Sequence, residues 1–79
     1  MSLYFFDIQF GDAPTSIDEE GQSHPDVDAA RVEAGLMLTG LAREMLHAGK
    51  VVSSLTIRVR DEIGEVMYAR LEIQMKRLN

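Results

Sequence analysis

The stretch LTIRVRDEIGEVMYARLEIQM, residues 55–75, decides the fold of this chain. Apolar and polar side chains alternate on both sides of a short turn, which is typical of two strands that each bury one face. Both apolar sets must lie on the same face of the sheet, and this condition selects the loop length. A three-residue loop, 62–64, satisfies it and gives Gly64 a positive φ, whereas a four-residue loop separates the two sets. The predicted antiparallel pairs are Asp61 with Glu65, Val59 with Met67, Arg58 with Tyr68, Ile57 with Ala69, and Thr56 with Arg70.

The N-terminal residues 3–10 show the same period of two. After a turn, we expect a short strand, Thr15–Asp18, to return along the first one. This arrangement places Ile8 opposite Ile17, which keeps both side chains on the apolar face. A second turn is expected at 18–21, because Asp and Gly occupy its first and fourth positions. The apolar even positions of the first strand are Tyr4, Phe6, Ile8 and Phe10.

The middle of the chain predicts one amphipathic helix of about 22 residues. Asp26 is the predicted N-cap, because its carboxylate can accept hydrogen bonds from the first turn, and a start near Ser23 is the alternative. Gly49 is expected in the left-handed conformation that ends many helices, with Lys50 beside the negative end of the helix dipole. The apolar positions fall at steps of three and four, at Ala30, Ala34, Met37, Leu38, Leu41, Met45 and Ala48.

These elements together predict an α+β fold of the order β-β-α-β-β. We expect residues 1–79 to form a single small domain, a two-layer sandwich with an antiparallel sheet of about four strands. The long helix packs on one face of this sheet. The order of the strands within the sheet stays open, because the alternation of side chains does not specify which hairpin strands are neighbours.

The composition excludes several classes of function. The 79 residues carry a formal net charge of -5 and contain no cysteine, so neither a disulfide framework nor a thiolate zinc site is possible. The first thirty residues hold seven acids and no lysine or arginine, which argues against nucleic-acid binding as a general activity. No apolar run reaches the roughly 18 residues of a membrane span. We therefore expect a cytoplasmic protein without a membrane partner.

Catalytic and metal-binding patterns are not found in the sequence. The two histidines, His24 and His47, have no partner ligands at metal-binding spacing. Ser53 and Ser54 lack the glycine elbow of a nucleophilic serine, and no glycine-rich phosphate loop occurs. The acidic turn at 18–20 lacks the alternating ligands of a calcium loop. We expect no catalytic residue, no metal and no cofactor, and hence a protein that is not an enzyme.

Two surfaces are candidates for an interface. On the sheet face away from the helix, aromatic, apolar and basic side chains gather, with Arg58 expected to cover Tyr68 and Arg70 to pair with Glu72 or Asp7. Single-stranded RNA is a less favoured ligand for this face. On the back of the helix, an apolar stripe would be exposed in a monomer, and we expect a homodimer through one of these surfaces. The candidate interface residues are Phe5, Val32, Leu36, Arg58, Val66, Tyr68 and Arg70.

Four motifs along the chain suggest a family. They are Tyr4-Phe5-Phe6-Asp7-Ile8, Asp18-x-x-Gly21, Pro25-Asp26-x-x-x-Ala30-Arg31-x-Glu33-Ala34, and Ile57-Arg58-Val59-Arg60-Asp61-x-x-Gly64. This combination resembles a family of short uncharacterised alpha-proteobacterial proteins, common in rhizobia. The resemblance implies no biochemical activity and no catalytic residue. The chain departs from it at residues 36–40, which are more apolar than expected.

A fainter likeness points to an alternative function. The glycine-containing turn before an acid-capped helix resembles the small β-rich part of HicB-type antitoxins. This likeness implies an antitoxin-like module whose acidic N-terminal surface covers a small basic protein partner. The sequence therefore leaves two hypotheses, a self-associating interaction domain and an antitoxin-like module.

Overall fold

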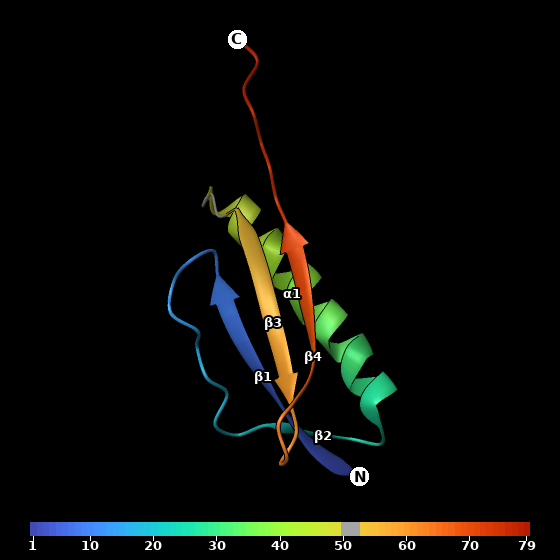
Figure 1. The fold of residues 1–79 in the computed structure, drawn as a ribbon. Coiled ribbons are helices and arrows are strands. Elements are labelled where there is room, and N and C mark those ends of the chain that lie inside the picture. The colour runs from blue at the N-terminus through green and yellow to red at the C-terminus, as the bar shows by residue number, and fades with distance from the viewer. Residues whose placement is uncertain (50–52) are drawn as a thin grey trace.

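A computed structural model describes residues 1–49 and 53–79 as two layers, a four-stranded antiparallel sheet and one helix on one of its faces (Figure 1). The strands lie in the order β2-β1-β3-β4. The predicted α+β fold is therefore confirmed. The elements are β1 (Ser2–Phe10), β2 (Gln22–His24), α1 (Val27–His47), β3 (Ser54–Arg60) and β4 (Glu65–Glu72).

The hairpin of β3 and β4 has the predicted register over most of its length. Val59 pairs with Met67, and the pairs at Arg58, Ile57 and Thr56 are also those predicted. The loop differs, because Arg60 pairs with Glu65 across a register shift and Gly64 does not adopt a positive φ. The pairing of Asp61 with Glu65 and the positive φ at Gly64 were wrong predictions.

The side chain of Asp61 explains the different loop. Its Oδ1 accepts hydrogen bonds from the N–H of Ile63 at 2.8 Å and of Gly64 at 3.0 Å. The Asp61 N–H in turn donates to the Gly64 carbonyl at 2.9 Å, which closes a four-residue loop. The shift leaves Val66 as an extra residue, and this bulge returns the apolar side chains of β4 to the face of Val59.

The second strand lies later in the chain than predicted. Residues 22–24 pair with 2–4 of β1, whereas the segment 15–18 forms only an isolated bridge between Ile8 and Ser16. The predicted pairing of Ile8 with Ile17 is wrong by one residue, and Ile17 is exposed. The reason is Asp18, whose carboxylate binds backbone N–H groups that a continued strand would have paired with carbonyls.

The helix begins where predicted. Asp26 is the N-cap, and its Oδ1 accepts a hydrogen bond from the Ala29 N–H at 2.9 Å. Gly49 has the predicted positive φ of 72°, whereas Lys50 lies outside the described residues. The predicted apolar stripe has two errors, because Ala48 is the exposed C-cap and the buried Ala42 was missed. The helical residues that become buried are Ala30, Ala34, Leu38, Ala42 and Met45.

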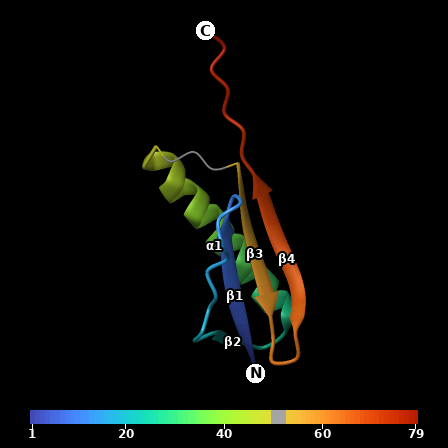
Figure 2. The same ribbon diagram turned by 60° about the vertical axis from the view of Figure 1, so that its left-hand side comes forward.

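The core lies between α1 and the central strands. Leu55, Ile57 and Val59 of β3 are completely buried, because β1 and β4 flank this strand and α1 covers its inner face. Figures 1 and 2 show α1 crossing the sheet as a separate layer. Tyr4 and Phe6 of β1 join this core, and partly buried side chains surround it. The surrounding side chains include Ile8, Phe10, Met37, Leu41, Met67, Ala69, Leu71 and Ile73.

Truncation at the centre of β3 is expected to unfold the domain. Ile57→Ala should lower the free energy of unfolding by about 2–5 kcal/mol, because the site is fully buried. That loss is comparable to the roughly 3–5 kcal/mol of stability that a core of this size supplies. Urea denaturation followed by circular dichroism measures it. Ile63→Ala, at a loop position that is 97% exposed, is the control and should leave the midpoint unchanged.

Candidate interaction surfaces and the ion-pair network beside them

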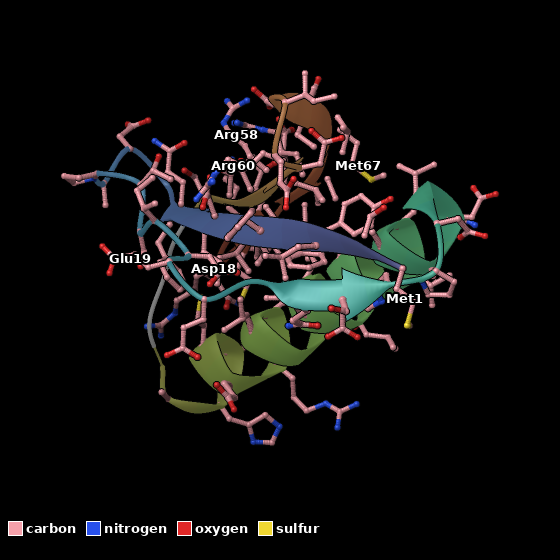
Figure 3. The ribbon with its side chains drawn as sticks, turned by 90° about the horizontal axis from the view of Figure 1, so that it is seen from below. Met1, Asp18, Glu19, Arg58, Arg60 and Met67 are labelled. Carbon is pink, nitrogen blue, oxygen red and sulfur yellow. The ribbon has the colours of Figure 1, made fainter. Side chains whose placement is uncertain are left out.

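A network of three charged residues joins the loop after β1 to the sheet. The Arg60 Nε donates to Oδ2 of Asp7 at 2.9 Å, and its Nη2 donates to the Asp18 carbonyl at 2.7 Å. Asp7 is buried on β1, and the Arg60 guanidinium also lies 4.4 Å from the centre of the Phe5 ring. Figure 3 shows Arg60 and Asp18 together beside β1. The Arg60–Asp7 ion pair therefore lies beside the Phe5 ring, on the face of the sheet opposite α1.

Asp18 is the hydrogen-bond centre of this loop. Its Oδ2 accepts from the Phe6 N–H at 3.0 Å, and its Oδ1 accepts from the N–H groups of Glu20 and Gly21, both at 3.1 Å. Partial burial by itself raises the pKa of Asp18. These backbone donors and the Arg60 charge outweigh burial and hold the pKa below its ordinary value. The ionised carboxylate therefore fastens the loop.

The motifs behind the family resemblance meet in this network. Asp7, Asp18 and Arg60 come from three of the four motifs, and Gly21 closes the turn with a φ of 76°. A Cβ at Gly21 would lie 3.0 Å from the Phe5 ring and from the Tyr4 carbonyl, so only glycine fits. All four carboxylate oxygens of Asp7 and Asp18, and Nε and Nη2 of Arg60, have hydrogen-bond partners, which indicates that the network holds the loop in place.

The outer face of the sheet gathers five of the predicted interface residues. The Arg58 guanidinium lies 5.6 Å from the centre of the Tyr68 ring, as predicted, and pairs with Glu65 at 3.0 Å. Arg70 pairs with Glu72 at 3.4 Å, which is one of the two predicted partners. Because each arginine on this face already faces a carboxylate, phosphate groups would have to displace these acids. The five residues on this face are Phe5, Arg58, Val66, Tyr68 and Arg70.

The other two predicted interface residues lie on a different surface. Val32 and Leu36 are 52% and 63% exposed on α1, which packs on the opposite face of the sheet. The structure therefore does not bring them together with Tyr68 and its neighbours. The helix back and the outer sheet face are two separate candidate surfaces.

A third surface, the free edge of β4, was not identified from the sequence. No residue in the described ranges 1–49 and 53–79 pairs with the outer side of this eight-residue strand. The opposite side of the sheet is covered, because β2 pairs with the start of β1 and the loop bonds to Ile8 and Phe6. Only the strand order reveals this difference, and the sequence left that order open.

The described residues offer no further site of recognisable chemistry. Within them, no three histidine or carboxylate side chains lie close enough to hold a metal ion. No helix in this part of the chain has the length and apolar character needed to cross a membrane. One shallow surface hollow lies at the end of β4, lined by Ser53, Arg70, Glu72, Ile73 and Gln74.

The fold and its surfaces define a small two-layer α+β domain, with one sheet edge left open by the part of the chain that the structure describes. Residues 3–71 match the family model described as a domain of unknown function, DUF6894. The chain belongs to this family. No curated protein and no solved structure matches the chain significantly. The family confirms the expectation of an uncharacterised protein group.

Removing the Asp18 charge is expected to weaken the fold at neutral pH. Asp18→Asn should lower the free energy of unfolding by about 1–2 kcal/mol, because three backbone donors lose a charged acceptor. The folded-state pKa is depressed, so this stabilisation is present above the unfolded pKa near 3.8 and is lost as pH falls through the folded pKa. Urea unfolding at pH 7 and at pH 3 measures both effects.

The control for this experiment is Glu19→Gln. It removes the same charge from an exposed neighbouring residue and should change stability little at either pH. Equal losses for the two variants at pH 7, or a loss for Asp18→Asn that persists at acid pH, would contradict the assigned role of the carboxylate.

Proposed function

We propose that this chain is a non-enzymatic, self-associating protein-interaction domain. The observation that carries the proposal is the asymmetry of the sheet, in which β1 is covered while no residue of 1–49 or 53–79 covers the edge of β4. An exposed strand of eight residues presents unpaired N–H and C=O groups, and proteins commonly cover such an edge. A second copy of the chain covers it in a homodimer.

The small core supports self-association. A domain of this size gains only about 3–5 kcal/mol from its own interior, so burial against a second copy adds substantially to its stability. Apolar side chains are available at the surface, because Tyr68 is 63% and Met75 is 73% exposed. Arg58, Arg60 and Arg70 on the outer face are each paired with a carboxylate. This pairing favours binding of a protein surface over binding of a phosphate group or a substrate.

The antitoxin-like module with a basic protein partner stays a prediction of the sequence, because the described contacts do not favour it over self-association. The alpha-proteobacterial origin and the cytoplasmic location likewise stay predictions. Isolation of the tagged chain from its own cells tests the alternative. Stoichiometric recovery of a small basic protein would support the antitoxin-like function in place of self-association.

The mass of the purified chain in solution tests the proposed function. We expect light scattering at micromolar concentration to give twice the monomer mass of 8.8 kDa. The mass should fall towards that of the monomer on dilution, because the association is a concentration-dependent equilibrium. A monomer mass throughout the micromolar range would contradict self-association.

A further inference from the structure

The backbone of β4 directs specific hydrogen-bonding groups to its free edge. The Ile73 N–H donates to the Ser53 carbonyl at 2.9 Å, so the backbone of Ile73 faces β3. Backbone groups of an antiparallel strand alternate between its two sides. The N–H and C=O groups of Tyr68, Arg70 and Glu72 therefore face away from β3, towards the open edge.

This alternation restricts how two copies can pair through β4. The side chains of Tyr68, Arg70 and Glu72 lie on the outer sheet face, whereas Met67, Ala69 and Leu71 lie on the face of α1. When a second β4 strand pairs with this edge, side chains of the outer face must lie opposite side chains of the outer face. The backbone N–H and C=O groups that point to the edge must also lie opposite the same groups of the partner strand. Only registers that pair even-numbered with even-numbered residues meet both conditions at once.

Charge selects among these registers. In the antiparallel register centred on Leu71, each Arg70 faces the Glu72 of the other copy, so two ion pairs form across the edge. A register centred on Arg70 opposes two arginines, and one centred on Glu72 opposes two glutamates. A register centred on Ala69 opposes Arg70 to Tyr68 and leaves Glu72 facing Val66.

The apolar face supports the same register. It places Ala69 opposite Ile73 and Met67 opposite Met75 of the other copy, so Met75 loses its exposure. Residues 73–79 extend beyond β4, away from the body of the domain (Figures 1 and 2). In this register the start of that extension runs along the first half of the partner's β4. The pairing thus covers Met75, which is 73% exposed in the single chain.

We propose that two copies join through their β4 edges in the register centred on Leu71. The result is one continuous eight-stranded antiparallel sheet with both α1 helices on the same face. Arg70 and Glu72 determine the register, and Leu71 lies on the two-fold axis. This proposal rests on the proposed self-association and names its surface and geometry.

Charge exchange tests the register. Arg70→Glu and Glu72→Arg each place like charges opposite one another twice, which should weaken the dimer by about tenfold or more. The double variant Arg70→Glu/Glu72→Arg restores both pairs and should dimerise like the unaltered chain. An equimolar mixture of the two single variants should form a heterodimer, because all four opposing charges are then complementary. Light scattering and native mass spectrometry measure these states, and thermal melts verify that each variant is folded.

A cysteine at the axis tests the geometry in a chain that otherwise has none. Two Leu71 residues on the axis face each other in a non-hydrogen-bonded pair, with their Cα atoms about 4.5 Å apart. This separation suits a disulfide, so Leu71→Cys should cross-link rapidly under mild oxidation. Ala69→Cys is the control and should not cross-link, because its counterpart lies four residues away along the partner strand.

The outcomes separate this proposal from the proposed function. A dimer that tolerates both single charge variants, and whose Leu71→Cys form does not cross-link, would overturn the β4 register while leaving self-association intact. In that case Leu36→Lys on the helix back should disrupt the dimer. An unaltered chain that is monomeric at micromolar concentration would overturn both proposals.

Discussion

The complete burial of one face of β3 is the constraint on which the rest of the structure depends. Leu55, Ile57 and Val59 are inaccessible to solvent only while β1 and β4 bond to both sides of the strand and α1 covers it. The last third of the chain therefore supplies the centre of the sheet. The strand β1, which pairs with it, lies in the first third of the sequence. The fold forms around contacts between residues far apart in sequence, such as Phe6 with Val59.

The loop between β1 and β2 shows how an ionised carboxylate can replace a strand. Asp18 satisfies backbone donors that a continuous ladder would otherwise pair, and Arg60 ties both Asp18 and Asp7 to the end of β3. This fastening accounts for Asp7, Asp18, Gly21 and Arg60 together. One loop thus gives a structural account of four residues that belong to three of the four motifs.

Sequence periodicity was sufficient for the layers, the helix cap at Asp26 and the pairing of Val59 with Met67. It could not distinguish a three-residue loop from a four-residue loop with a bulge at Val66, because both keep the apolar side chains on one face. It also misplaced the second strand, since the alternation at 15–18 does not reveal that the Asp18 side chain competes for backbone groups. The exposure of Leu36 and Tyr68 followed from their positions in the repeat. The free edge of β4 did not, because strand order depends on contacts between the two hairpins.

The covering of β1 by β2 and the Asp18 loop limits how far sheets of this protein can grow. A chain with two open edges can add further chains indefinitely and produce fibrils. Here the β1 edge is covered within each chain, so the proposed pairing through β4 would end with two chains. The cover of the β1 edge consists of three parts, which are the pairing with β2, the Ile8–Ser16 bridge and the hydrogen bond from the Phe6 N–H to Asp18.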